Sequence, residues 1–508
     1  MASPLATRAA ARQSPMNTAA WPFDNSYAAL PEHFYTRQAP TPVAAPGPVR
    51  VNRALATTLG LDPDWLASPA GTRVLAGNEV PPGAAPLAAV YAGHQFGSYN
   101  PQLGDGRAIL LGEVIDRAGE RFDIQLKGAG RTPYSRGGDG RAPLGPVLRE
   151  YVVSEAMATL GVPTSRALAA VTTGETVYRD RPLPGAVLTR VARSHIRIGT
   201  FEFFAARRDT DALRALADHV IARHYPALRD AANPPLALLQ GAVERQAALV
   251  SQWQLLGFIH GVMNTDNMLL SGETIDYGPC AFMDAFHPDT VFSSIDHGGR
   301  YAYRNQPAIA HWNLAVLAQS LLPLLHDDPE EAVKLAQGAV DTFPDHFLAA
   351  HQRGLNRKLG LTEAREGDRE LAEELFELMA GERVDFTLFF RRLADFAAPD
   401  SAAATVEDLF PMPARFLPWM QRWQARCGQE STGAGERQAA MYRANPAFIP
   451  RNHLVEEAIA AAVDNGDFTP FHALVERLAA PFDYDPADRR LALPPTPEQM
   501  VHQTFCGT

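Results

Sequence analysis

The chain has 508 residues, of which 46% are hydrophobic and 20% charged, and its formal net charge is −11. This composition is typical of a globular protein with a sizeable core, and the acidic balance disfavours nucleic acid as the main partner. The three cysteines contain no CxxC pair, which excludes a disulfide framework and a cysteine-rich zinc site and indicates a reducing compartment.

The longest apolar run, residues 314–325, is shorter than the roughly 20 residues that a membrane span needs. We therefore expect a core helix there, no membrane association and a cytoplasmic protein. Residues 1–45 begin with an Ala-rich stretch that has no acid before Asp24 and no apolar centre of a secretory signal. A disordered or extended N-terminal extension is the simpler interpretation, and a targeting peptide is the alternative.

Strand-like patterns dominate from about residue 86 to residue 130. The runs "AILLGEVI" (108–115) and "RFDIQLKG" (121–128) flank the turn-forming "DRAGE" and predict a hairpin. A helix follows over 147–161, between Pro146 and Gly161. After a strand-like start at 185, helical patterns cover 209–225, 238–261, 311–326, 364–398 and 453–480.

These elements predict an α+β fold with two lobes. A small β-rich N-lobe would span 46–186, and a large helical C-lobe with a helical C-terminal extension would span 187–508. This outline is that of a protein-kinase-like fold.

Two glycines in "QLGDGR", Gly104 and Gly106, would let the backbone approach a phosphate closely. Taken alone, this segment is more typical of a plain hairpin turn. The glycines are followed by Arg107 and by a strand that ends in Lys127, which is the order in which kinases place a glycine loop and a phosphate-binding lysine. A lysine at an exposed strand end is the competing interpretation.

An acid on the next helix would hold Lys127 in place, and Glu150 and Glu155 are the two candidates. The apolar periodicity puts Glu155 nearer the buried side, whereas Glu150 is closer to the end of the strand. We favour Glu150; a solvated glutamate is the alternative for either position.

More candidate phosphate contacts lie in "RGGDGR", which contains Asp139 and Gly140, and at Arg190 and Arg197. Loops rich in glycine and arginine suit polyanions, and arginine binds phosphate through two parallel hydrogen bonds. A surface loop is the alternative interpretation for residues 136–141.

The segment "HGVMNTDN" (260–267), followed by "DYGP", has the spacing of a kinase catalytic loop and metal loop. Asn267 and Asp276 offer the oxygen ligands that Mg²⁺ or Mn²⁺ would use together with ATP phosphates. Val262 occupies the position of the usual catalytic aspartate and cannot accept a proton. Asp266 is the only carboxylate left in the loop, so any catalytic base there must be Asp266.

The segments "YAGHQFG", "QLGDGR", "LKGAGRTPYSRGGDGR", "SEAM", "HGVMNTDN" and "DYGP" closely resemble the selenoprotein O family of kinase-like proteins, which includes the bacterial YdiU proteins. The resemblance implies a pseudokinase fold that transfers AMP from ATP to Ser, Thr or Tyr hydroxyls of proteins, with ATP bound in a flipped orientation. It implies Asp266 as the base, Asn267 and Asp276 as metal ligands, and the following nucleotide contacts: Gly104, Gly106, Arg107, Lys127, Asp139, Gly140, Arg190, Arg197 and Asp276.

The partners expected are ATP and protein substrates, without nucleic acid or membrane, and we expect a monomer. A kinase of protein or small-molecule hydroxyls and an inactive nucleotide-binding scaffold are the alternatives. Some members of the family carry selenocysteine near the C-terminus, where this chain has Cys506. A disulfide between Cys506 and Cys280 that gates the site is a further hypothesis, and inert cysteines are its alternative.

Overall fold

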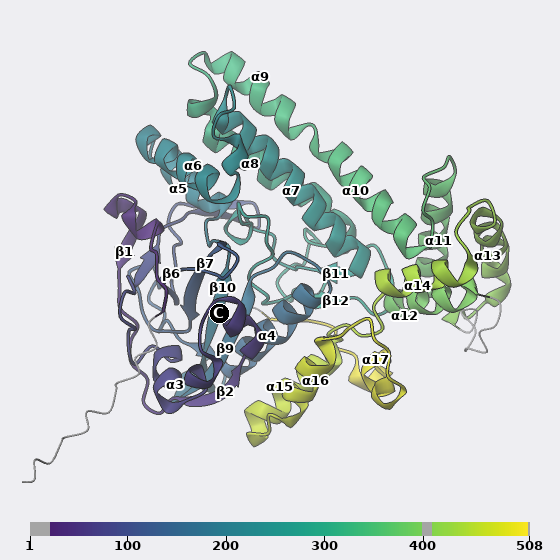
Figure 1. The fold of residues 1–508 in the computed structure, drawn as a ribbon, viewed down its shortest axis with the longest axis horizontal. Coiled ribbons are helices and arrows are strands. Elements are labelled where there is room, and N and C mark those ends of the chain that lie inside the picture. The colour runs from purple at the N-terminus through teal and green to yellow at the C-terminus, as the bar shows by residue number, and fades with distance from the viewer. Residues whose placement is uncertain (1–20, 399–408, 506–508) are drawn as a thin grey trace, which may run out of the picture.

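The structure is a computed structural model that describes residues 21–398 and 409–505. It is a mixed α+β protein in which an antiparallel sheet, built by the first part of the chain, lies beside a large helical region (Figure 1). The α+β class expected from the sequence is therefore confirmed.

The main sheet has the strand order β1-β3-β6-β7-β10-β9-β2, with β8 paired to β10, and its neighbouring strands are antiparallel. Its strands are β1 (Tyr35–Arg37), β2 (Gly47–Val51), β3 (Leu87–Ala89), β6 (Ala108–Ile115), β7 (Arg121–Lys127), β8 (Ala142–Pro143), β9 (Arg166–Tyr178) and β10 (Pro182–Ala192). Two short ribbons lie outside it: β4 (Gly93–Gln95) with β5 (Ser98–Asn100), and β11 (Phe258–Ile259) with β12 (Ala281–Phe282).

The predicted hairpin is present as β6 and β7. Strand β10 continues past residue 186, where the sequence placed the end of the N-lobe, because its pairing with β7 and β9 extends to Val191 and Ala192. Strand β9 carries no clear alternation in its Ala- and Thr-rich sequence, so the pattern did not predict it.

Residues 21–45 do not form the disordered or extended segment that the sequence suggested. Trp21, Tyr27 and Phe34 are buried in the core, two 3-10 turns form at Tyr27–Ala29 and Glu32–Phe34, and β1 pairs with β3. The physical reason is the aromatic content of this stretch, because burying large rings offsets the entropy of ordering the chain. Residues 1–20 lie outside the described part of the structure.

The two faces of the sheet carry different side chains because successive residues of a strand point to opposite sides. Ile124 and Leu126 of β7 pack with α1 (Arg53–Thr58), α2 (Pro63–Leu66) and α3 (Pro69–Leu75). Leu188 of β10 belongs to the core on the opposite face, with α4 (Leu144–Thr159), which α15 (Asn452–Asn465) and α16 (Thr469–Leu478) cover in turn. Lys127 lies opposite Leu188 in the paired strands, and Arg190 is two residues further along β10, so both side chains point to the same face of the sheet as Leu188. The face that α4 covers is therefore the one with buried charge.

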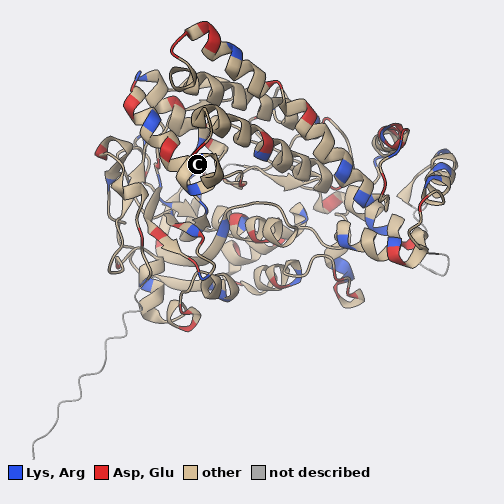
Figure 2. Cartoon of the chain, turned by 45° about the horizontal axis from the view of Figure 1, so that its top comes forward, with Lys and Arg blue, Asp and Glu red and all other residues tan. Residues whose placement is uncertain are grey.

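The helical region begins with α5 (Ile198–Ala206), α6 (Thr210–His224), α7 (Pro234–Leu256), α8 (Gln306–Leu325), α9 (Pro329–Val340) and α10 (Phe343–Lys358). It continues with α11 (Asp368–Glu382), α12 (Phe386–Leu393), α13 (Pro413–Cys427), α14 (Ala434–Ala444) and α17 (Arg489–Ala492). Acidic and basic residues are interspersed over the described chain (Figure 2).

One helical stretch of the described chain, Tyr303–Leu325, is long and apolar enough to cross a membrane by length and composition. Helix α8 makes up most of this stretch and packs against α5, α7 and α9. More than half of its most apolar part is buried inside the protein. Packing of this kind is that of a core helix, as the sequence suggested.

Candidate active site

A cavity of about 590 Å³ lies where the sheet, α4 and the loop 260–279 meet. Its wall contains every residue that the sequence singled out for the site: Gly104, Gly106, Arg107, Lys127, Asp139, Gly140, Glu150, Arg190, Arg197, Asp266, Asn267 and Asp276. Residues spread over more than 170 positions of the chain are thus brought to one place.

An ion-pair network forms the deep wall of this cavity. Lys127 Nζ lies 2.5 Å from Glu150 Oε2 and 3.2 Å from Asp276 Oδ1. Arg190 lies between the same two acids, 2.6 Å from a Glu150 oxygen and 2.7 Å from Asp276 Oδ1. Arg197 Nη1 is 3.0 Å from Asp276 Oδ2. Three cations therefore share two carboxylates, which leaves an excess of positive charge facing the cavity.

The charge of this network fixes the protonation of its acids. Burial alone would raise the pKa of Asp276, but Arg190, Lys127 and Arg197 outweigh it and hold that pKa well below its usual range. The pKa of Glu150 is likewise lowered, because Arg190 and Lys127 overcome the effect of burial. Burial lowers the pKa of Lys127, an effect that Glu150 opposes.

Lys127 pairs with Glu150 and not with Glu155. Glu155 faces β9, where it binds Arg166 at 2.7 Å and accepts a hydrogen bond from the backbone N–H of Ala167 at 2.8 Å. The two glutamates of α4 thus do different work: Glu150 holds the cations of the site, and Glu155 ties the helix to the sheet.

Asp266 lies on a 3-10 turn, Thr265–Asn267, and is only 8% exposed. Burial raises the pKa of Asp266 to about 6, although Arg197 opposes the shift. Its Oδ2 is 3.5 Å from Gln95 Nε2, and its Oδ1 has no hydrogen-bond partner among the described residues. A carboxylate with a raised pKa at a cavity wall is suited to accept a proton near neutral pH.

The turn is held against the end of the sheet. Arg197 donates a hydrogen bond to the backbone oxygen of Asp266, and the N–H of Ile198 binds the oxygen of Met268 at 2.9 Å. Asn267 donates from Nδ2 to the Val262 oxygen at 3.0 Å, which leaves its Oδ1 as the atom that can accept or coordinate.

Asp276 has a backbone φ of +64°, a conformation that is uncommon outside glycine, although asparagine and aspartate adopt it more often than other residues. His260 supports the segment just before it, because His260 Nε2 contacts the oxygen of Ile275 at 2.8 Å. Tyr277 is fixed from the other side by contact with Thr164. The carboxylate of Asp276 therefore faces the cations at the cost of local backbone strain.

The two glycine-rich segments pack against each other. A Cβ at Gly104 (φ +72°) would lie 2.4 Å from the Tyr134 ring, and a Cβ at Gly106 would lie 2.8 Å from the Tyr134 oxygen. Gly140 (φ +69°) approaches Gly130 still more closely. This close packing already requires glycine, so their presence alone does not indicate phosphate contact.

Asp139 is bound by Arg179, whose two Nη atoms lie 2.8 and 3.1 Å from its oxygens, and this arginine lowers the pKa of Asp139. Arg179 also lines the cavity and was not predicted from the sequence, since a lone arginine in the turn between two strands gives no signal.

Tyr91 and Gln95 also line the cavity and were not singled out from the sequence, although both lie in the "YAGHQFG" segment. The guanidinium of Arg197 stacks on the Tyr91 ring at 4.6 Å.

The cysteine hypothesis is only partly within the described structure. Cys280 is fully buried, whereas Cys506 lies outside the described residues. The chain does return to this region, because Thr504 Oγ1 donates to the oxygen of Pro279 at 2.6 Å.

A lysine held by a glutamate, loop carboxylates and glycine-rich turns around one cation-lined cavity are the parts that phosphate-transferring enzymes place around a nucleotide. The class of protein that this arrangement defines is a nucleotide-dependent transferase.

Comparison with known proteins narrows this class. Residues 18–479 match the family model described as protein adenylyltransferase SelO. A protein of Rhodopseudomonas palustris (strain BisB5) named "Protein nucleotidyltransferase YdiU" is 61% identical over 97% of this chain and 100% of its own length. Proteins of the same name from Bradyrhizobium sp. (strain ORS 278) and Bradyrhizobium diazoefficiens are each 60% identical, with the same coverage. The chain belongs to the SelO family of protein adenylyltransferases.

Proposed function

We propose that the protein transfers AMP from ATP to Ser, Thr or Tyr hydroxyls of other proteins and releases pyrophosphate. The observation that carries this proposal is the exchange of roles in the loop 260–267. Val262 stands where a kinase has its base, and Asp266, with a raised pKa, lies on the cavity wall four residues later.

A base in a different place requires a different phosphorus to be attacked. Lys127, Arg190 and Arg197 form a cationic wall that would attract the most highly charged end of ATP. With the terminal phosphates held there, the nucleotide lies in reverse of the kinase orientation and its α-phosphorus faces Asp266. Arg107, Asp139 with Arg179, and the turns at Gly104, Gly106 and Gly140 would complete the nucleotide contacts.

In the reaction, Asp266 takes the proton of the acceptor hydroxyl as its oxygen bonds to the α-phosphorus. The bond between the α-phosphorus and the bridging oxygen breaks, and that oxygen leaves with pyrophosphate. Lys127 and the two arginines would stabilise the negative charge that grows on the leaving group, which is the main contribution expected in phosphoryl-type transfer.

Asn267 and Asp276 are the residues that would hold Mg²⁺ or Mn²⁺. Both offer oxygen to a hard cation: Asp276 is ionised, and the Nδ2 of Asn267 is bound elsewhere, which leaves Oδ1. No group of three or more His, Cys, Asp or Glu side chains suited to a metal occurs within residues 21–398 and 409–505, so phosphates and water would complete the shell. The ion, when bound, would neutralise phosphate charge.

We further propose a two-lobed kinase-like fold, with an N-lobe of about residues 46–186 extended by the rest of β10, and the catalytic and metal loops in the C-lobe. The enzyme would act as a cytoplasmic monomer on protein substrates, without nucleic acid or membrane. The 60–61% identity to bacterial proteins named protein nucleotidyltransferases supports the choice of protein as acceptor.

The test is to incubate the full chain and a protein acceptor with ATP labelled at either the α- or the γ-phosphate. Label in protein from the α position only supports AMP transfer. Label from the γ position only would indicate a kinase, and label from neither would indicate a nucleotide-binding scaffold. Asp266→Ala should abolish α-label incorporation while ATP still binds with nearly unchanged affinity.

A further inference from the structure

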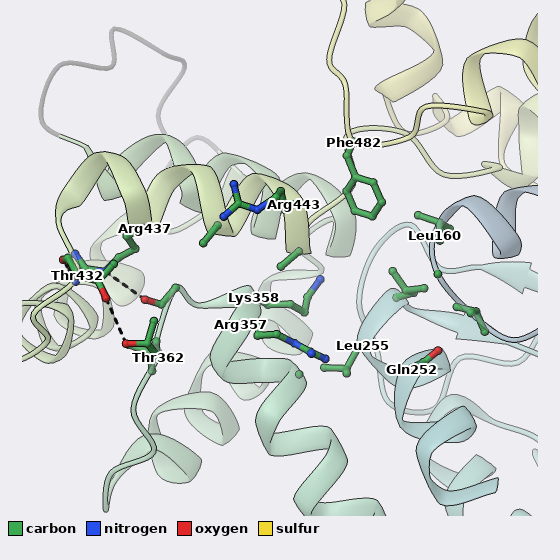
Figure 3. Close-up of a pocket in the computed structure, with 18 residues that line it drawn as sticks. Leu160, Gln252, Leu255, Arg357, Lys358, Thr362, Thr432, Arg437, Arg443 and Phe482 are labelled. Atoms are coloured by element: carbon green, nitrogen blue, oxygen red, sulfur yellow. Dashed lines mark hydrogen bonds between the residues drawn. The ribbon is translucent and has the colours of Figure 1, made fainter. Parts of the chain in front are cut away.

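A second cavity, of about 570 Å³, lies away from the site described above, where the ends of α4, α7 and α10 meet α14 (Figure 3). Four cations line it: Arg357 and Lys358 at the end of α10, and Arg437 and Arg443 on α14. None of the described residues on its wall is acidic. Cations gathered around a cavity without acids repel one another, so the cavity favours an anionic occupant.

Lys358 is the deepest of the four cations, with only 4% of the residue exposed. Its Nζ lies 4.2 Å from the centre of the Phe390 ring and 5.5 Å from that of Phe386. Within the described chain, no hydrogen bond or ion pair joins this ammonium to another residue. Burial lowers the pKa of Lys358 to about 7. Ring faces compensate only part of the lost hydration of an ammonium group.

The other cations of the cavity differ in their contacts. Arg437 donates from Nε and Nη2 to backbone oxygens, among them those of Cys427 at 2.8 Å and Thr432 at 3.0 Å, and so holds neighbouring backbone segments together. Arg357 and Arg443 are exposed, and both line the same cavity as Lys358 (Figure 3). One buried cation and two exposed ones thus surround the same space.

The identity of residue 358 is unusual for this chain. Lys127, Lys334 and Lys358 are its only lysines, among 46 basic residues. Lys127 is held by Glu150 and Lys334 by Glu331, at 2.5 and 2.6 Å. Among the described residues, Lys358 is therefore the one lysine without a carboxylate partner, and it lies at a buried position on the cavity wall.

The rest of the wall is mostly apolar, with Leu255, Leu256, Leu361, Ala440 and Phe482 among its members. A volume of this size suits a small organic molecule. We propose that this cavity binds a small amphipathic anion, made of an apolar body and one carboxylate or phosphate head group, with the head group on Lys358 and flanked by Arg357 and Arg443. This site is independent of the group that the enzyme transfers.

Calorimetric titration of the full chain tests the proposal with octanoate and octyl phosphate as probes. At least one of them should bind with a stoichiometry near one, and the tighter of the two identifies the head group. Octanol and inorganic phosphate, which each lack one half of the ligand, should bind at least about tenfold more weakly. Failure of both anions to bind would overturn the proposal.

The matched variants are Lys358→Met, which removes the buried ammonium group, and Lys334→Met, which removes an exposed one. Lys358→Met should weaken the binding of the probe at least about tenfold, and Lys334→Met should leave it unchanged. Equal affinity in both variants would overturn the proposal.

Two measurements on the unaltered chain keep the test valid if Lys358→Met fails to fold. Acetylation followed by mass spectrometry reads each of the three lysines separately, and the probe should protect Lys358 but not Lys334. An unchanged rate at Lys358 with saturating probe would contradict the site.

Proton uptake is the second measurement. An anion bound at Lys358 raises the pKa of this lysine from about 7, so the protein should take up part of a proton when the probe binds at pH 7. The affinity for the probe should fall as the pH rises above 7. The arginines on the elements packed around Lys358 include Arg357, Arg391, Arg437 and Arg443, and the same elements carry Glu436 and His351, whose pKa burial lowers to about 4. Asp395 is already engaged by Tyr442 and Arg391. Octanoate is fully ionised at pH 7, so its binding without proton uptake would exclude Lys358 as the head-group partner.

Discussion

Gly93 lies directly against Asp266: a Cβ atom added at Gly93 would stand 2.7 Å from Asp266 Oδ1 and 3.0 Å from its Cβ. The ribbon that contains Gly93 is tied to the same loop, because the N–H of His94 binds Thr265 Oγ1 at 2.7 Å. The N–H of Phe96 binds Asn264 Oδ1 at 3.1 Å. The backbone of β4 thus forms one wall of the space in which the carboxylate lies.

Gly93→Ala should therefore impair the chemistry more than the fold. The new methyl group must displace the carboxylate, and a misplacement of this kind lowers transfer by at least about tenfold. Nucleotide affinity should change little. Gly338→Ala is the control, since nothing lies within 4 Å of a Cβ there and alanine favours helix α9. Wild-type kinetics of AMP transfer in Gly93→Ala would contradict the role given to Asp266.

The rate of transfer should depend on pH through Asp266. Burial raises its pKa to about 6, and only the ionised form accepts a proton. The rate at saturating ATP should thus rise about tenfold per pH unit below pH 6 and level off above pH 7. ATP affinity measured at each pH is the control that separates chemistry from binding. A rate that stays constant from pH 5 to pH 8 would argue for another base.

Glu150→Gln and Glu155→Gln form a matched pair on α4. Glu150→Gln leaves Lys127 and Arg190 with Asp276 as their only acid, so it should lower the free energy of unfolding by about 2–4 kcal/mol and slow transfer at least about tenfold. Glu155→Gln loosens the contact with Arg166 and should affect stability alone. Denaturant unfolding and single-turnover kinetics measure the two effects. Equal loss of transfer in both variants would show that α4 acts only through its stability.

Asp276→Asn tests the metal ligand without disturbing the backbone, because asparagine tolerates the positive φ of this position. Transfer should fall by at least about a hundredfold, and Mg²⁺ or Mn²⁺ should no longer tighten ATP binding. In EDTA the variant should bind ATP at least as tightly as the unaltered chain, because Lys127, Arg190 and Arg197 lose a competing carboxylate. An undiminished effect of the metal in the variant would place the ion elsewhere.

The sequence predicted most of the candidate site because its residues lie in short segments with recognisable spacing. Strand alternation and the glycine turns led to Lys127 and Gly104, and the loop spacing led to Asn267 and Asp276. Contacts made between segments left no such signal. The sequence around Arg179 does not show that it binds Asp139, and the sequence around Tyr91 does not show that its ring lies under Arg197. Both pairs form only when the sheet is assembled.

The fold was predictable where one periodicity dominates. Strands β6 and β7 and the long helices α7 and α8 have clear patterns, whereas β9 begins with small residues that suit helix and strand alike. The N-terminal segment was misjudged because Ala- and Pro-rich composition outweighed its few aromatic residues, which tertiary packing then buries.

The path of residues 38–46 has a consequence for how the protein is made. Strand β1 lies at one edge of the main sheet and β2 at the other, so this short connection crosses the sheet from edge to edge. Six strand spacings of about 4.8 Å amount to roughly 29 Å, close to the reach of a connection of this length in extended form. Strand β2 pairs with β9, so during translation β2 cannot join the sheet until Arg166–Tyr178 has left the ribosome. The β2 edge of the sheet is therefore completed late in synthesis, by a strand that was made early.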